Sequence, residues 1–150
     1  MRSFLGIDLT RQRTKLYDMV WPKLGPKGVD EYHLTLQFLP EVEYSQFLEI
    51  RDHLGKFAYP KFNITLDEFV AMPSAAKPQL YALIDSWGAP KLHAFRLALK
   101  EHFKGKAEFS PVFKPHVTIA REKVLGDFYA GCDTINAIKP LDLIVDNVSI

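Results

Sequence analysis

Cysteine is almost absent from this chain of 150 residues, and long apolar runs are missing altogether. The single thiol, Cys132, excludes an internal disulfide, so we expect a reducing, cytoplasmic setting. No apolar run reaches the roughly 18 residues that a membrane-spanning helix needs. The opening MRSFLGIDLTRQR lacks the order of a signal peptide, because Asp8 interrupts its short apolar run. The sequence therefore predicts neither a membrane span nor an export signal.

An excess of charge of either sign is missing as well. The chain has 19 Lys and Arg against 18 Asp and Glu, which leaves a formal net charge of +1. This balance argues against a broad surface that coats nucleic acid, but it is compatible with a local basic groove. Hydrophobic residues make up 47% of the chain, which is enough to bury the core of one domain.

Hydrophobic periodicity predicts a mixture of strands and helices in each half of the chain. We expect strands over 3–9, 31–39, 61–70, 80–85, 112–121 and 139–150, and helices over 10–20, 44–54 and 90–103. The stretch MPSAAKP, residues 72–78, has two prolines and several small residues and is the best candidate for a linker. We therefore expect one two-lobed domain, with lobes at about 1–75 and 76–150.

Two of the predicted strands carry the same short motif. In YHLTLQF, alternation places His33 and Thr35 on one face of the strand and the apolar residues on the other. In PHVTIAR, His116 and Thr118 share a face in the same way. The two histidines are as far apart in the chain as the two threonines, and this constant offset suggests an ancient duplication of one lobe. Two lobes related by a pseudo-twofold axis would bring both motifs into one cleft.

Paired histidines and threonines suit metal-independent chemistry on a phosphoester. A histidine, with an ordinary pKa of about 6.5, can give or take a proton near neutral pH. Two histidines that face one substrate can act as base and acid in a single turnover. Threonine hydroxyls can donate hydrogen bonds to the non-bridging oxygens of a phosphate and stabilise its growing charge. The alternative is a zinc site, but only Glu31 shares a face with a motif histidine, so we expect no metal and no cofactor.

The motifs HLTLQF and HVTIAR resemble the two signatures of the two-histidine phosphoesterase superfamily. The chain is most similar to the branch of RNA 2′,3′-cyclic phosphodiesterases, also called 2′-5′ RNA ligases. FLGIDL resembles the first strand of that branch, YHLTLQFLPEV its first motif with the following turn, and FKPHVTIAR its second motif. The resemblance runs in order from residue 3 to about residue 148.

The resemblance implies an α+β, bilobal fold, in which antiparallel sheets of two pseudo-twofold-related lobes face a central cleft and helices lie outside. It implies hydrolysis of an RNA or nucleoside 2′,3′-cyclic phosphate to a 2′-phosphate, and reversible 2′-5′ ligation in some members. His33 and His116 would form the acid–base pair, and Thr35 and Thr118 would hold the phosphate. We favour His116 as base and His33 as acid, although the symmetric motifs do not distinguish them. The predicted partner is an RNA end or a cyclic nucleotide, and we expect a monomer.

Arg121 matches the arginine that closes the second motif, which implies a contact with the substrate's phosphates. Its odd spacing from His116 turns it away from the cleft unless the strand ends or bulges near Ala120. An interpretation as a surface salt bridge is equally open. Relatives usually continue past the last strand with another hairpin, and they often carry an arginine where this chain has Lys77. Both differences bear on substrate binding more than on the chemistry.

Aromatic residues near the motifs have two possible roles. Tyr32 and Phe113 flank the motifs and could stack on a base of single-stranded RNA, although core packing is the simpler interpretation for Phe113. Phe38 and Ile119 lie on the apolar faces of their strands, so we expect both in the core.

Three alternative functions remain open on the sequence alone. The same chemistry would serve another small cyclic phosphate, such as an ADP-ribose derivative, or 2′-5′ oligoadenylate. A non-catalytic module that binds RNA ends would retain the cleft without turnover. A purely structural domain would leave the repeated motif unexplained. Turnover of mononucleotides compared with oligonucleotides separates the first alternative from the main hypothesis, and retained binding without turnover would support the second.

Overall fold

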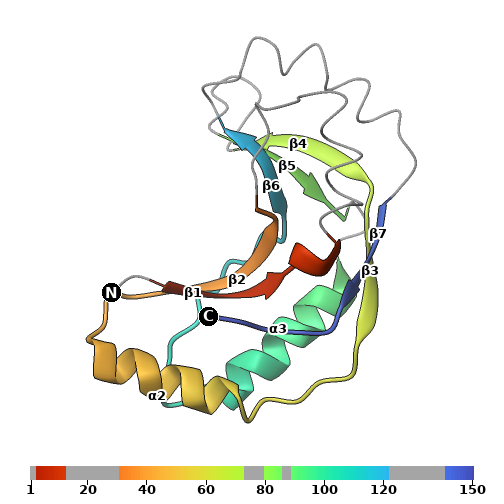
Figure 1. Ribbon diagram of the computed structural model, residues 1–150. Helices are drawn as coiled ribbons and strands as arrows, with labels where there is room; N and C mark the ends of the chain where they lie inside the picture. The colour runs from red at the N-terminus through yellow and green to blue at the C-terminus, as the bar shows by residue number, and fades with distance from the viewer. Residues whose placement is uncertain (1–2, 13–30, 73–79, 86–88, 122–140) are drawn as a thin grey trace.

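The fold is built from two antiparallel sheets and two helices. The computed structural model describes residues 3–12, 31–72, 80–85, 89–121 and 141–150. The elements are β1 (Ser3–Asp8), the 3₁₀ turn η1 (Thr10–Gln12), β2 (His33–Leu39), α2 (Tyr44–Leu54), β3 (Phe62–Leu66), β4 (Glu68–Met72), β5 (Leu80–Ile84), α3 (Pro90–His102), β6 (Val117–Arg121) and β7 (Leu141–Val145). A five-stranded sheet has the order β1-β2-β6-β5-β4, and β3 pairs with β7 in a second sheet (Figure 1). The predicted α+β class with antiparallel sheets is confirmed.

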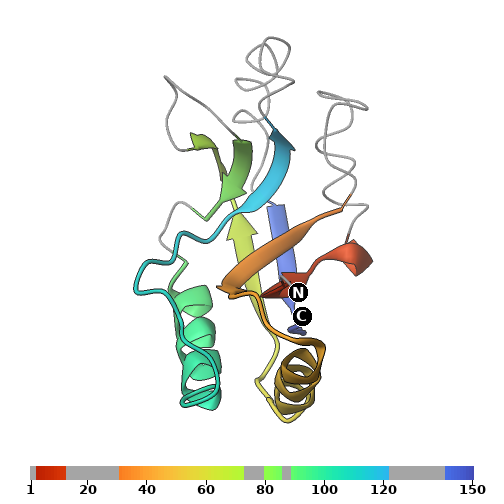
Figure 2. The same cartoon turned by 90° about the vertical axis from the view of Figure 1, so that its left-hand side faces the viewer.

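The core lies between the β1–β2 part of the large sheet, the small sheet and the two helices. Figures 1 and 2 both place α2 and α3 below β1 and β2. Alternating residues of β1 and β2 point into this core, and the residues of α3 at helical spacing meet them. The fully buried side chains include Leu5, Ile7, Leu34, Leu36, Leu92, Leu99 and Phe103.

Several predicted boundaries hold and others shift. The helix predicted at 44–54 has these bounds, and Gly55 ends it with a backbone hydrogen bond of 3.1 Å to the carbonyl of Arg51. The strand predicted at 61–70 is two strands, β3 and β4, which join different sheets. A helix is predicted at 10–20. The structure describes its first three residues, which form the η1 turn, and the remainder lies outside the described residues. The linker at 72–78 also lies outside them, apart from its first residue.

The two halves of the chain are interleaved in the sheets. β4 comes from the first half and pairs with β5 of the second, whereas β7 comes from the second half and pairs with β3 of the first. The large sheet is continuous from β2 to β6, so the two motif strands lie side by side instead of facing each other from separate sheets. Separation into two lobes at about 75 stays a prediction.

Each motif strand carries a β-bulge directly after its threonine. In β2 the pairing with β1 shifts at Leu36, between the pairs Gly6–Thr35 and Leu5–Gln37. In β6 the pairing with β5 shifts at Ile119, between the pairs Ala82–Thr118 and Tyr81–Ala120. Leu36 and Ile119 are equivalent positions of the repeat, because each directly follows the threonine of its motif. A bulge adds one residue and reverses the alternation of the residues beyond it.

The bulge in β2 corrects the prediction for Phe38. Strict alternation places Phe38 in the core, but its side chain is 69% exposed. Phe38 is paired with Phe4 on β1, and the two rings meet edge to face with centroids 6.0 Å apart. The extra residue therefore moves Phe38 onto the face of the sheet that carries His33 and Thr35. Ile119, the other residue predicted for the core, is fully buried.

The side chain of Arg96 on α3 ties the bulge of β2 to the segment that leads to the second motif. Its Nε donates to the carbonyl of Leu36 at 2.8 Å, and its Nη2 donates to Gln37 Oε1 at 2.9 Å and to the carbonyl of Ser110 at 2.8 Å. The amide N–H of Ser110 donates to the same Gln37 oxygen at 2.8 Å. The guanidinium also lies 4.8 Å from the ring centroid of Phe113. Burial lowers the pKa of Arg96 from its usual value.

The C-terminal ends of the two helices are held together by a pair of histidines. The rings of His53 on α2 and His102 on α3 are stacked with centroids 4.1 Å apart. Nε2 of each ring lies within hydrogen-bond distance of the other residue's backbone carbonyl, at 2.6 and 2.7 Å. These contacts satisfy carbonyls at helix ends, which have no partner within their own helix. Within the described residues, no helix is long and apolar enough to cross a membrane.

Replacement of Arg96 by methionine should lower the free energy of unfolding by roughly 2–4 kcal/mol, because the carbonyls of Leu36 and Ser110 lose a buried donor. Urea denaturation followed by circular dichroism measures the change. The matched control is Arg51→Met on the exposed surface of α2, which should change stability by less than about 1 kcal/mol. Equal losses in the two variants would contradict a specific role for Arg96 in holding the bulge.

Candidate active site

The structure brings the two histidine–threonine motifs together at the junction of β2 and β6. Leu34 pairs with Val117 in antiparallel register, and both side chains are fully buried. In an antiparallel pair the flanking residues meet in reverse order. This register puts His33 across from Thr118 on the face opposite Leu34 and Val117, and it brings Thr35 to the end of β6 that His116 directly precedes. All four side chains are half-buried, so the sheet supports them from behind and leaves their tips accessible.

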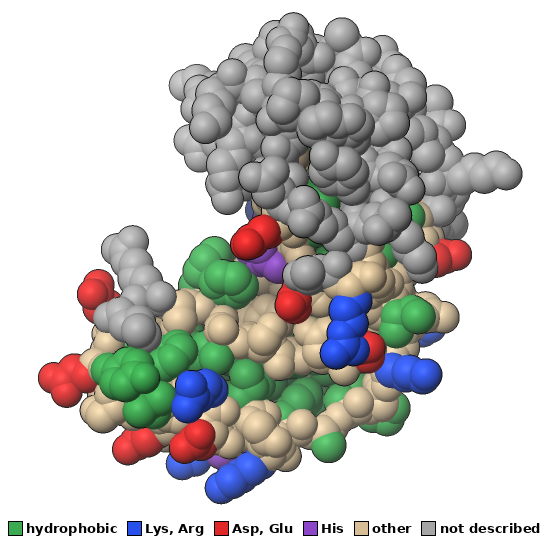
Figure 3. Space-filling view, in the orientation of Figure 1, with side chains coloured by type: hydrophobic (Ala, Val, Ile, Leu, Met, Phe, Trp, Pro, Cys, Tyr) green, Lys and Arg blue, Asp and Glu red, His purple; other side chains and the backbone are tan. Residues whose placement is uncertain are grey.

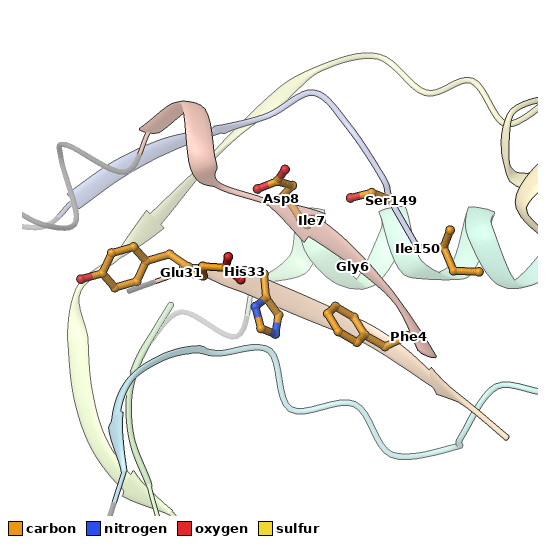
Figure 4. Close-up of a pocket in the computed structure, with 9 residues that line it drawn as sticks. Phe4, Gly6, Ile7, Asp8, Glu31, His33, Ser149 and Ile150 are labelled. Carbon is orange, nitrogen blue, oxygen red and sulfur yellow. The ribbon is translucent and has the colours of Figure 1, made fainter. Parts of the chain in front are cut away.

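The imidazole of His33 is held by an aromatic ring from β1. Phe4 stacks on His33 with ring centroids 4.7 Å apart and an angle of 25° between the planes. Figure 4 shows both rings on the same side of the β1–β2 ribbon. The space for the Phe4 ring depends on Gly6, because a Cβ atom there would lie 2.9 Å from Phe4 Cε2 and 3.1 Å from the carbonyl oxygen of Leu34. The motif FLGIDL thus contributes a support for the first histidine.

The imidazole of His116 is oriented by its own backbone. His116 lies immediately before β6, and its Nδ1 is 2.8 Å from the carbonyl oxygen of Lys114. Since a carbonyl only accepts hydrogen bonds, this contact assigns the Nδ1 proton and leaves Nε2 as the nitrogen that can exchange a proton with a substrate. The strand predicted at 112–121 therefore begins later, at Val117, and the segment before it forms an irregular approach to the site.

β6 has the bulge near Ala120 that Arg121 needs if it is to face the cleft. Ile119 is an extra residue in β6, and position 121 pairs with Leu80 beyond it. The backbone at position 121 therefore falls on the same face of the strand as Thr118. The side chain of Arg121 lies outside the described residues. Its contact with phosphate stays a prediction.

A pocket beside His33 has two carboxylates in its lining. It has a volume of about 250 Å³, and its lining includes Asp8, Glu31, His33, Ser149 and Phe4 (Figure 4). Figure 3 shows acidic side chains beside a histidine on this face of the molecule. Two carboxylates would repel an anion at short range. A phosphate is therefore expected on the side of His33 that faces Thr118 and β6.

The described residues contain no group of three or more His, Cys, Asp or Glu side chains placed to hold a metal ion. The expected absence of a metal thus stays a prediction to be tested with a chelator.

Stacking on a base is excluded for Tyr32, which is 3% exposed and belongs to the core. Phe113 is half-buried and lies under the guanidinium of Arg96, in line with the packing role expected for it. Among the side chains that the structure describes, Phe4 and Phe38 lie on the same face as His33. Periodicity did not identify them, because one acts from a neighbouring strand and the other changes face at a bulge.

Replacement of Gly6 by alanine should destabilise the protein by roughly 1–3 kcal/mol, because the new methyl group overpacks the Phe4 ring. The His33 imidazole resonances should shift with the displaced ring. Thermal unfolding and NMR of the histidine side chains measure the two effects.

The control for this change is Gly55→Ala, where the new Cβ would lie 3.3 Å from the carbonyl of Asp52 and the backbone is right-handed helical. It should alter stability by less than about 1 kcal/mol and leave His33 unchanged. Adding Phe4→Leu to Gly6→Ala should recover part of the stability. An unchanged His33 spectrum in Gly6→Ala would contradict the proposed support by Phe4.

Comparison with known proteins agrees with the geometry. The family model of the 2′-5′ RNA ligase superfamily matches residues 26–150. An RNA 2′,3′-cyclic phosphodiesterase of Thermotoga maritima is 26% identical over 164 aligned positions, which cover 100% of this chain and 85% of the relative. Another, of Aeropyrum pernix, is 32% identical over 97 positions, which cover 63% of this chain and 54% of the relative.

The fold is similar to a solved structure as well. The structure of E. coli LigT complexed with ATP has a TM-score of 0.65 at 22% identity, with 98% of this chain and 84% of that chain covered. Because the family model spans most of the chain and includes both motifs, this protein belongs to the 2′-5′ RNA ligase superfamily.

Proposed function

We propose that this protein is a metal-independent RNA 2′,3′-cyclic phosphodiesterase, which hydrolyses the cyclic phosphate at an RNA end to a 2′-phosphate. The observation that supports the proposal is the Leu34–Val117 pairing, which joins the strand that carries His33 and Thr35 to the strand that carries Thr118 and directly follows His116. The names of the relatives from T. maritima and A. pernix support the substrate class.

The reaction follows from the two imidazoles and the two hydroxyls. His116 accepts a proton from water at Nε2 while the water oxygen attacks phosphorus. The bond between phosphorus and the 3′ oxygen breaks, and His33 donates a proton to that oxygen. Thr35 and Thr118 donate hydrogen bonds to the non-bridging oxygens, whose charge grows in the transition state. The 5′ hydroxyl of a second RNA in place of water would form a 2′-5′ linkage with the same residues.

The surroundings of the two histidines support this assignment of roles. The His33 ring lies on the face of Phe4 and beside a pocket that includes Asp8 and Glu31. An acid carries a positive charge on its imidazole before it donates its proton, and such a charge is attracted by the negative face of an aromatic ring and by carboxylates. His116 has its Nδ1 proton committed to Lys114 and presents Nε2, as a base requires in the neutral form. The repeat is symmetric in sequence, but the two environments differ.

Turnover of an RNA oligonucleotide with a terminal 2′,3′-cyclic phosphate should proceed in EDTA and yield the 2′-phosphate. His33→Ala and His116→Ala should each lower kcat by roughly 10²–10⁴-fold, because each removes one positioned proton-transfer group. Chromatography that separates 2′- and 3′-phosphate products measures both rate and regiochemistry.

The matched control is His93→Ala, an exposed histidine of α3 outside the site, which should retain activity within about threefold. Loss of turnover in EDTA that zinc or magnesium restores would contradict the metal-free mechanism. Turnover that survives either motif substitution in a folded variant would contradict the paired-histidine mechanism. Binding of the oligonucleotide without turnover would favour a module that only recognises RNA ends.

A substrate whose leaving group needs no proton distinguishes the acid from the base. A 4-nitrophenyl ester of a 3′-deoxynucleoside 2′-phosphate releases nitrophenolate, which needs no proton donor. His33→Ala should therefore lose less than about tenfold with this ester, against roughly 10²–10⁴-fold with the cyclic phosphate, whereas His116→Ala should lose activity on both. Initial rates on the two substrates give the ratio. The opposite pattern would reverse the assignment of acid and base.

A further inference from the structure

An aromatic side chain with no role in the chemistry lies exposed on the same face as the two motifs. The bulge at Leu36 moves Phe38 onto this face, where 69% of its surface is accessible. Phe38 follows Thr35 by three residues, or about 10 Å along a strand at ~3.3 Å per residue. One exposed apolar ring is common on a protein surface, so exposure alone does not indicate a function for Phe38.

The Phe4 ring connects Phe38 to the first motif. Its centroid lies 4.7 Å from that of the His33 ring and 6.0 Å from that of the Phe38 ring. Because His33 and Phe4 are already stacked on each other, the exposed ring that a nucleotide beyond the terminal one would reach is Phe38. Because a cyclic phosphate ends the RNA at its 3′ side, the chain can continue from the site only in the 5′ direction.

Phe38 also lines a groove on the surface. The groove has a volume of about 970 Å³, and its lining includes Phe38, Pro40, Lys106, Phe109, Ser110 and Pro111. Glu108 also lines it, so the charge of Lys106 is balanced. Apolar and aromatic walls with a few polar groups suit a nucleobase better than a phosphate. Stacking, more than neutralisation of phosphates, would provide the affinity.

The internal repeat gives Phe38 a counterpart. Phe38 and Arg121 occupy equivalent positions of the repeat, and each follows a bulge that reverses the strand's alternation. The repeat thus has an aromatic residue at one position and an arginine at the equivalent one. A nucleotide has two recognisable parts, a flat base and a phosphate, and these two residue types suit one part each.

We propose that Phe38 is the stacking platform for the nucleobase directly 5′ of the terminal nucleotide, and that the groove beside it receives the upstream RNA. The inference rests on the proposed function, because the direction of the RNA follows from a cyclic phosphate at His33. Stacking of an upstream base on Phe38 makes the protein selective for oligonucleotides over mononucleotides. Stacking is tolerant of base identity, so little sequence preference is expected.

The test compares kcat/KM for a trinucleotide and a mononucleotide, each ending in 2′,3′-cyclic phosphate. Phe38→Ala should lower the ratio of the two constants about tenfold, mainly through the KM of the trinucleotide. Phe38→Trp should keep the ratio within about threefold of the wild type, since it retains a stacking surface. The matched control is Leu97→Ala, an apolar residue of α3 with 57% exposure, which should leave the ratio unchanged.

Two results would overturn the proposal. An equal loss on both substrates in Phe38→Ala would show that Phe38 acts through Phe4 on His33 and contacts no upstream base. An unchanged ratio would show that the groove receives no RNA. Wild-type protein without turnover would count against the proposed function instead. Fluorescence anisotropy of a labelled trinucleotide 2′-phosphate then decides the role of Phe38, because weaker binding by Phe38→Ala alone supports it and equal binding overturns it.

Discussion

The antiparallel pairing of Leu34 with Val117 is the contact on which the rest of the site depends. It joins two strands that lie far apart in the sequence and that come from different halves of the chain. Both side chains are fully buried, so the register is fixed by the core and a slip of one residue would expose apolar side chains. The histidines and threonines meet on the accessible face because their apolar neighbours meet on the other. The packing of the core thereby determines where the two motifs lie relative to each other.

Both motif strands depart from regular alternation at a β-bulge. Each bulge follows the threonine of its motif and brings a later position back to the accessible face. In β2 this costs a regular hydrogen-bonding pattern, and the guanidinium of Arg96 supplies a donor to the carbonyl of the extra residue, Leu36. The same guanidinium reaches Ser110 and Phe113, on the segment that leads to His116. One buried cation therefore contacts the flanks of both motifs.

Much of this arrangement could be predicted from local sequence. The 44–54 helix follows from its apolar spacing and Gly55, and the burial of Leu34, Val117 and Ile119 follows from alternation. The convergence of the two motifs was predicted from the internal repeat. Periodicity could not predict the bulge at Leu36, because the alternation HLTLQF continues without a break in the sequence. Alternation therefore places Phe38 in the core, and it gives no indication of the contacts that Phe4 and Arg96 make from other elements.

The most direct test of the account is a crystal structure of the protein with a nucleoside 2′-phosphate, the product of the proposed reaction. We predict that the phosphate lies at the β2–β6 junction, with its oxygens within hydrogen-bond distance of the hydroxyls of Thr35 and Thr118. The imidazoles of His33 and His116 should lie on opposite sides of the phosphorus atom. A phosphate that contacts only one motif, or that lies in the pocket beside Asp8 and Glu31, would contradict the central claim that the paired strands form one site.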